Sequence, residues 1–214
     1  MYTLNIDIDA AGLAVLADAG QSVVVAQGVS SVAGTTSARA AVLAGAPGGL
    51  VAWLAFSPLE HNVLTWSGAY RIFATTSPLE TGQVLTMASA TPGDAQPGAV
   101  YLYQEGQFTP GAEPCQHYGM LNLGQTPSPA FGLAAEANIN NTPVTAPASV
   151  IKVLYNQEAG FNPQGMLLVF VASIGSSGSF VGQAPDSALK VPFSLAAPTA
   201  SIRFADATNT FVPA

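Results

Sequence analysis

Charged side chains are scarce in this chain. It has five lysines or arginines and twelve aspartates or glutamates in 214 residues, or 8%, whereas about a quarter of an ordinary globular domain is charged. Catalytic acids and bases, metal ligands and phosphate-binding groups must all come from this small pool. The net charge is −7, and the five cations are too scattered to form a basic patch. We therefore expect no nucleic-acid partner, because neutralisation of phosphate charge dominates that kind of binding.

Cysteine and long apolar runs are also lacking. Cys115 is the only cysteine, which excludes an intrachain disulfide and a zinc site built from several thiolates. The first residues carry no positive segment followed by an apolar run, so they do not form a classical signal peptide. The densest apolar run, 166–171, is far shorter than the ~20 residues that span a bilayer. We expect a soluble protein, either cytoplasmic or exported without a leader.

The motifs that usually mark an enzyme are missing as well. The sequence has no G-x-S-x-G nucleophile elbow, no G-x-x-x-x-G-K-S/T phosphate loop and no G-x-G-x-x-G dinucleotide loop. Its two histidines are His61 and His117. Cys115 and His117 are two residues apart, so on a strand their side chains would lie on the same face. Such side chains point in parallel and rarely reach the geometry of a nucleophile and its base, so we interpret Cys115 as a thiol without a catalytic partner. We expect no enzyme activity, no catalytic residue, no cofactor and no metal site.

Turn-forming residues and apolar residues are plentiful, and together they predict the fold. The chain is 49% apolar, and its 21 glycines and 16 prolines are scattered along its length, which is typical of short strands joined by many turns. We predict one all-β domain over residues 1–214, an antiparallel β-sandwich or flattened barrel with one short N-terminal helix. Asp9 fits the N-cap of this helix, 10–19 its body, and Gly20 its stop.

The strands are predicted from alternating or continuous apolar residues. The continuous run 50–56 is expected to be one buried strand centred on Trp53, and 109–129 is expected to be mostly loop. Residues 37–43 could form a helix as readily as a strand, judged by their intrinsic propensities. The other expected strands are 4–8, 22–26, 63–66, 69–74, 83–87, 100–103, 118–123, 150–155, 166–172, 191–195, 201–204 and 210–212.

Aromatic side chains provide the candidate binding surface. Sugar-binding sites combine aromatic faces with neutral amides and hydroxyls, and this chain is rich in Asn, Gln, Ser and Thr. We assign Trp53 to the core because its neighbours are all apolar. Tyr118 is a further aromatic residue that could line a sugar-stacking surface. The candidate ligand-binding residues are Trp66, Tyr70, Tyr101 and Tyr103.

Two classes of function fit these features. We favour a non-enzymatic binding or self-assembling β-sandwich protein, with lectin-like recognition of neutral glycans or surfaces and itself as a partner in a homo-oligomer. Low charge reduces the electrostatic penalty of self-association. The alternative is a membrane-active, pore-forming protein. A short N-terminal helix ahead of a sandwich is similar in architecture to the actinoporin-like cytolysins, although no sequence motif carries that similarity.

Overall fold

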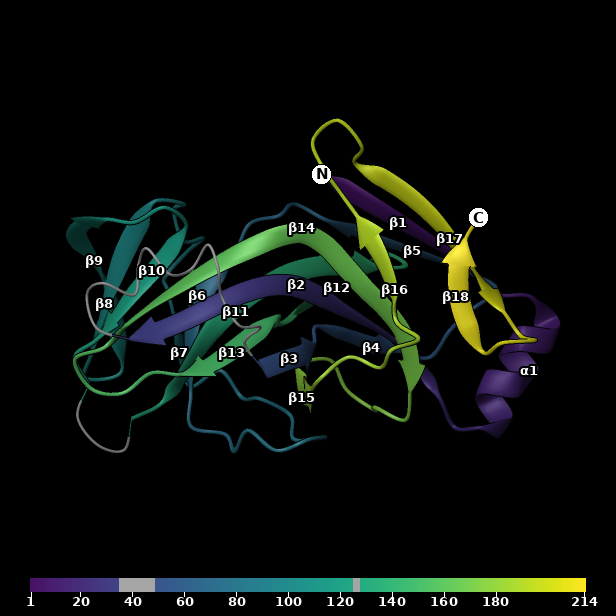
Figure 1. The fold of residues 1–214 in the computed structure, drawn as a ribbon, viewed down its shortest axis with the longest axis horizontal. Coiled ribbons are helices and arrows are strands. Elements are labelled where there is room, and N and C mark those ends of the chain that lie inside the picture. Colours follow the sequence, from purple (N-terminus) through teal and green to yellow (C-terminus); the bar gives the residue numbers. More distant parts are fainter. Residues whose placement is uncertain (35–48, 125–127) are drawn as a thin grey trace.

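The computed structural model describes residues 1–34, 49–124 and 128–214. In these residues two curled β-sheets pack together, and one short helix lies at the end of the molecule near β18 (Figure 1). The all-β sandwich with one N-terminal helix, predicted from the sequence, is confirmed. The predicted helical alternative for 37–43 lies outside the described residues. No helix in the described part of the chain is long and apolar enough to cross a membrane.

Within the described residues the first sheet has eleven strands. Eight follow the order β15-β3-β13-β11-β5-β1-β17-β18, while β12 and β6 also pair with β11, and β7 pairs with β6. Their bounds are β1 (Tyr2–Asp7), β3 (Gly49–Ala52), β5 (His61–Trp66), β6 (Arg71–Thr75), β7 (Ser89–Ala90), β11 (Ala130–Ile139), β12 (Thr142–Pro147), β13 (Ser149–Lys152), β15 (Ser179–Gly182), β17 (Thr199–Ala205) and β18 (Thr210–Pro213).

The second sheet has seven strands in the same described ranges. Six follow the order β4-β2-β14-β10-β8-β9, and β16 pairs with β14. Their bounds are β2 (Ser22–Gly34), β4 (Leu54–Phe56), β8 (Ala99–Gln104), β9 (Gln107–Pro114), β10 (Tyr118–Asn122), β14 (Glu158–Ala172) and β16 (Leu189–Pro192). Among the strand pairs of the described residues, two are parallel: β1 with β17, and β8 with β10.

The long antiparallel pair of β2 and β14 forms the backbone of the second sheet (Figure 1). The two strands stay paired from their Ser22–Ala172 end to their Gly34–Glu158 end, with a register shift between Pro163 and Leu167. A shift of this kind bends the strand and changes the direction of nearby side chains. Residues of this irregular segment line the cleft described below.

The helix α1 (Ala10–Asp18) begins at the predicted residue and ends one residue earlier than predicted, with Ala19 as its C-cap. The Asp9 carboxylate accepts a hydrogen bond from Gly12 N at 2.8 Å, which satisfies one of the free amides of the first turn. Gly20 has φ +60° just after the helix, a conformation that glycine adopts without strain. Gly12 and Leu16 are buried, so this helix packs against the sheets instead of lying free.

Trp53 marks the point where the chain crosses from one sheet to the other. The expected single strand 50–56 is instead two strands, β3 in the first sheet and β4 in the second, which meet at Trp53. The side chain is fully buried, as predicted, and its indole N–H donates to Ala135 O at 3.0 Å. A continuous apolar run is compatible with one long buried strand or with two short ones, because both β3 and β4 are largely buried in their own sheets.

Two further predictions are wrong. Residues 83–87 form no named strand in the described structure and make one isolated bridge, Val84 with Ser179. The stretch 109–129, expected to be mostly loop, contributes to β9, which pairs with β8 around a tight turn at Glu105 and Gly106. Pro110 and Pro114 argue against a strand, but β9 is at the edge of its sheet, where proline is tolerated.

Candidate functional site

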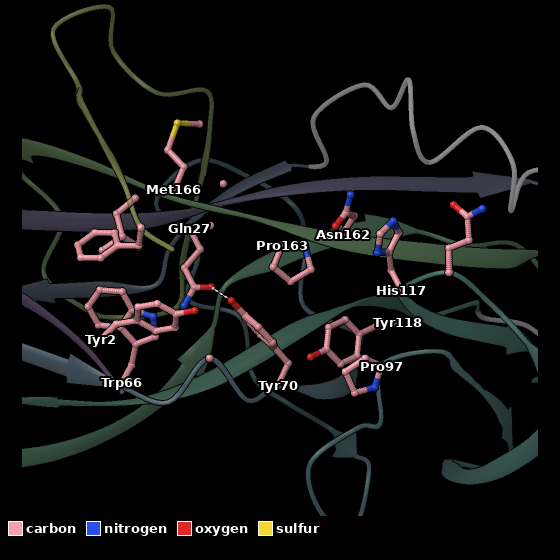
Figure 2. Close-up of a pocket in the computed structure, with 16 residues that line it drawn as sticks. Tyr2, Gln27, Trp66, Tyr70, Pro97, His117, Tyr118, Asn162, Pro163 and Met166 are labelled. Atoms are coloured by element: carbon pink, nitrogen blue, oxygen red, sulfur yellow. Dashed lines mark hydrogen bonds between the residues drawn. The ribbon is translucent and has the colours of Figure 1, made fainter. Parts of the chain in front are cut away.

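A cleft of about 280 Å³ is lined by residues from both sheets (Figure 2). The first sheet contributes Tyr2 and Trp66, and Tyr70 lies just before β6. The second sheet contributes Gln27 from β2 and Tyr118 from β10, together with the bulged part of β14. Such openings between packed elements are common places for small-molecule binding.

Three rings, which we call the aromatic wall, form one end of the cleft: Tyr2, Trp66 and Phe193. Tyr2 and Trp66 are direct partners across β1 and β5, and their rings stack with centroids 5.4 Å apart. Phe193 meets both rings edge-on, at 6.1 Å from Tyr2 and 4.9 Å from Trp66. Trp53 contacts Trp66 edge-on from the core at 6.0 Å. Mutual packing of this kind holds the aromatic wall in one arrangement.

The bulge in β14 places Phe193 in the wall. Phe193 N donates to Gly165 O at 2.7 Å, so the residue after β16 is attached to the bulge. Gly165 has φ +61°, and a Cβ added there would lie 2.8 Å from Phe193 O. Only glycine combines this conformation with so close an approach of a second backbone. The glycine in the bulge therefore determines where the Phe193 ring lies.

Gln27 supplies the buried polar group beside the aromatic wall. Its side-chain oxygen accepts a hydrogen bond of 2.6 Å from the Tyr70 hydroxyl, and the residue is only 4% exposed. Its Nε2 is buried and has no hydrogen-bond partner among the described residues. Burial, with smaller effects from Tyr118 and Tyr2, raises the pKa of Tyr70 well above its ordinary value. Tyr70 therefore stays protonated and remains a donor to Gln27.

His117 and Tyr118 lie toward the other end of the cleft (Figure 2). The His117 carbonyl accepts from Gly98 N, which holds this part of the chain, and His117 Nε2 is buried with no partner in the described structure. The Tyr118 ring meets Tyr70 edge-on with centroids 5.5 Å apart. Burial raises the pKa of Tyr118, and the charge of Asp94 adds to this effect. Its phenol is thus neutral at ordinary pH.

The chemistry of the cleft is that of neutral recognition. The described residues that line it include no Asp, Glu, Lys or Arg. Two buried nitrogens of residues that line the cleft, Gln27 Nε2 and His117 Nε2, have no hydrogen-bond partner in the described structure. A buried donor without a partner costs about 1–3 kcal/mol. A ligand that brings an acceptor to Gln27 and an apolar face to the aromatic wall recovers part of that cost.

The structure brings together two of the four predicted ligand-binding residues. Trp66 and Tyr70 both line the cleft, and so does Tyr118. Tyr101 lies elsewhere, and its hydroxyl accepts a hydrogen bond from Gln96 N at 3.1 Å. Tyr103 packs into the core, with its ring 5.0 Å from Phe108 and 4.9 Å from Phe131.

Sequence reasoning did not assign Tyr2, Gln27, His117 or Phe193 to a binding surface, although all of them line the cleft. Gln27 carried a usable signal, because it is a polar residue that directly follows the apolar run Val23–Ala26. A polar side chain at the end of a buried run must find a partner inside the protein. Tyr2 and Phe193 carried none, because they meet only through the pairing of strands that are distant in sequence.

His61 and Cys115 lie outside the cleft. His61 Nδ1 lies 2.8 Å from Asp7 Oδ1 on the exposed surface, where β5 and β1 pair. The hydrogen bond to Asp7 and the charge of that carboxylate raise the pKa of His61. The Cys115 thiol donates to the carbonyl oxygens of Ala99 and His117 at 3.1 and 3.2 Å. The described residues contain no group of three or more His, Cys, Asp or Glu placed to hold a metal ion.

The cleft has to be interpreted from its own residues. The chain matches no protein-family model, no curated protein and no solved structure.

Proposed function

We propose that this protein is a non-enzymatic, lectin-like binding protein whose cleft takes a small neutral ligand with an apolar ring face, such as a sugar. One observation carries the proposal. Gln27 Nε2 is a buried donor without a partner, held in place by Tyr70 and adjacent to the aromatic wall.

A sugar ring has the two surfaces that such a cleft complements. Its C–H face packs on aromatic rings, and its edge carries hydroxyl groups that donate and accept hydrogen bonds. The aromatic wall offers the apolar contact, while Gln27 and His117 offer hydrogen-bonding groups on the remaining sides. Because no Asp, Glu, Lys or Arg of the described structure lines the cleft, a charged ligand would lose its hydration without gaining an ion pair to one of these residues. The expected ligand is therefore uncharged.

The size of the cleft limits the ligand to about one ring. Its volume of about 280 Å³ is close to the lower end of the ~300–1,000 Å³ typical of small-molecule pockets. It corresponds to roughly nine water molecules at ~30 Å³ each. We therefore expect recognition of a single terminal sugar residue, with any further residues of a glycan outside the cleft.

A glycan array followed by calorimetric titration of the best ligand tests this proposal. The informative variant is Tyr2→Ser, which removes one ring of the aromatic wall while changing a partly exposed side chain. The matched control is Tyr155→Ser, because Tyr155 is 56% exposed and does not line the cleft. We expect Kd to rise about tenfold or more for Tyr2→Ser, in line with ~1.4 kcal/mol per decade, and to stay unchanged for Tyr155→Ser.

Two results would contradict the proposal. One is the absence of any binding to neutral glycans by the folded wild-type protein. The other is binding that Tyr2→Ser and Tyr155→Ser weaken equally, since the ligand would then occupy some other surface.

We also propose that the chain associates with itself. Several large apolar side chains are exposed, including Leu59, Leu154 and Leu195, and their burial between copies would offset the repulsion caused by the net charge of −7. Size-exclusion chromatography with light scattering measures this directly. A monomer at all concentrations tested would contradict it.

The membrane-active alternative stays a prediction. In the structure Gly12 and Leu16 of α1 are buried, so insertion of this helix into a bilayer would require it to leave the sheets. Dye leakage from lipid vesicles tests this function, and leakage without glycan binding would favour it over the lectin-like one.

A further inference from the structure

We infer that four strand edges of this protein are closed to a second copy of the chain by proline. The edge strands β9, β12, β16 and β18 each pair with a single strand among the described residues. They lie in both sheets, with β9 and β18 toward opposite ends of the molecule (Figure 1). The unpaired side of such a strand is a template on which another chain can add a strand. The inference does not depend on the ligand proposed for the cleft.

Pro192 in β16 and Pro213 in β18 occupy positions where a backbone N–H would point away from the sheet. Successive residues of an edge strand point their N–H groups alternately toward the neighbouring strand and away from it. The residue after each proline points inward, because Phe193 N donates to a carbonyl of β14 and Ala214 N to a carbonyl of β17. The two proline nitrogens therefore face outward.

Pro110 in β9 and Pro143 in β12 also face outward. Both strands begin directly after two-residue turns, and the residues that follow these turns, Gln107 and Thr142, point their N–H groups to the partner strand. Alternation from these residues directs the nitrogens of Pro110 and Pro143 away from the sheet. Ala148 N, which donates to a carbonyl of β11, agrees with this alternation in β12. The prolines of all four edges are exposed.

Proline here takes the place of the charged residues that usually protect a strand edge. Lysine and other charged side chains are a common protection, but only 8% of this chain is charged. The strands β12 and β18 contain no charged residue, and β16 contains one lysine. A short uncharged strand rich in β-branched residues, such as TPVTAP in β12, is prone to pair with copies of itself unless proline interrupts it.

The other end of each sheet, β15 or β4, is covered by the chain itself. Along β15, Phe180 N donates to Gln83 O and Gly82 N donates to Phe180 O. At β4, Ala55 N donates to the Ser177 hydroxyl at 3.0 Å. Proline is thus found on edges that lack such cover in the described structure.

The missing N–H groups determine how two copies can meet. A strand that approaches the edge of β12 finds the outward N–H of Thr145 but none at Pro143, so one of its own carbonyls is left without a donor. Burying a carbonyl without a donor is unfavourable. Self-association of this chain, as proposed above, is therefore expected to use exposed side chains and not strand edges.

The test replaces the prolines of two edges. Pro143→Thr combined with Pro192→Thr restores an outward N–H on β12 and on β16. The matched control is Pro78→Thr combined with Pro185→Thr, since both of these prolines are exposed and lie outside the strands. Light scattering over a range of protein concentrations should show that the edge variant associates about tenfold more tightly than the wild type, while the control matches the wild type. Thermal unfolding checks that both variants fold.

Amide hydrogen exchange shows whether the edges themselves pair. The N–H groups of Thr145 and Lys190 face outward, two residues from the replaced prolines. Pairing should slow their exchange in the concentrated edge variant, whereas in the wild type their exchange should be fast at every concentration.

Three results would overturn the inference. One is an edge variant that associates no more tightly than the control. Another is an edge variant that associates without slower exchange at Thr145 and Lys190. The third is slowed exchange of these two groups in the concentrated wild-type protein, which decides the matter even where the edge variant does not fold. None of these results bears on the ligand proposed for the cleft.

Discussion

The hydrogen bond between Tyr70 and Gln27 supports the cleft, and Tyr70→Phe tests its contribution to stability. The substitution keeps the ring and removes only the hydroxyl that donates to Gln27 Oε1 at 2.6 Å. Gln27 is 4% exposed, and its Nε2 already lacks a partner among the described residues. The variant therefore leaves both ends of a buried amide unpaired.

The magnitude follows from the burial of Gln27. An unsatisfied buried acceptor costs about 1–3 kcal/mol, and 1 kcal/mol corresponds to roughly 2–4 °C in Tm for a chain of this size. At about 2 kcal/mol, the middle of that range, Tyr70→Phe should lower Tm by roughly 4–8 °C, measured by differential scanning calorimetry. Tyr155→Phe is the matched control. Its side chain is 56% exposed, so its hydroxyl loss should change stability by less than ~0.5 kcal/mol.

A double-mutant cycle separates the hydrogen bond from other effects. Gln27→Leu leaves the Tyr70 hydroxyl unpaired, whereas Gln27→Leu combined with Tyr70→Phe replaces both partners by apolar groups. Since removing both partners costs less than stranding one, the double variant should be more stable than the sum of the single changes predicts, by about 1–2 kcal/mol. Additive effects, or a Tyr70→Phe variant as stable as Tyr155→Phe, would refute the reasoning.

Three further predictions concern the bulge, the alkaline range and the surface histidine. Gly165→Ala should destabilise the fold by about 2 kcal/mol, because φ is +61° there and a Cβ would meet Phe193 O at 2.8 Å. Gly175→Ala, where a Cβ meets nothing within 4 Å, should be neutral, and denaturant titration of both variants measures the difference. Because the pKa of Tyr70 is raised by burial, the unfolded chain loses this proton first, so stability is full below about pH 10 and falls above it. Unfolding measured at roughly pH 8 and pH 11 should show a smaller fall for Tyr70→Phe. The pKa of His61 is raised by Asp7, so the stabilisation from this pair is present below the ordinary histidine pKa and is lost as pH rises through the raised value. NMR titration should show a lower His61 pKa in Asp7→Asn, and an unchanged value would show that the pair does not form in solution.

Local signals predicted the helix well. Asp9 and Gly20 each act on neighbouring backbone groups, as a cap and as a left-handed stop, and such effects need no knowledge of the rest of the fold. The turn at Asn140 and Asn141 is also local, because both residues have positive φ in a two-residue hairpin. Two consecutive asparagines are a local signal for such a hairpin turn, because asparagine tolerates positive φ.

The central strand β11 shows why other elements escaped prediction. Its sequence, AFGLAAEANI, contains many alanines and one β-branched residue, so its intrinsic preference for strand is weak. In the structure it pairs with four strands, β5, β6, β12 and β13. Tertiary pairing, which a single sequence does not display, decides its conformation.

The cleft could be predicted only in part for the same reason. Trp66 and Tyr70 are four residues apart, and both stand out as aromatic residues near a turn. Tyr2 and Phe193 come from opposite ends of the chain and meet through the pairing and packing of distant strands. Tyr101 and Tyr103 are aromatic residues on a predicted strand, as Trp66 is, but their rings are buried away from the cleft.

The most direct test of the central claim, that the cleft binds a neutral ring, is an NMR titration of the two tryptophan indoles. Trp66 belongs to the aromatic wall, whereas the Trp53 indole is fully buried and donates to Ala135 O. Addition of a sugar found to bind should shift the Trp66 indole resonance and the Gln27 side-chain amide resonances, and should leave the Trp53 indole resonance nearly unchanged. Saturable binding with the Trp66 and Gln27 resonances unmoved would contradict the account.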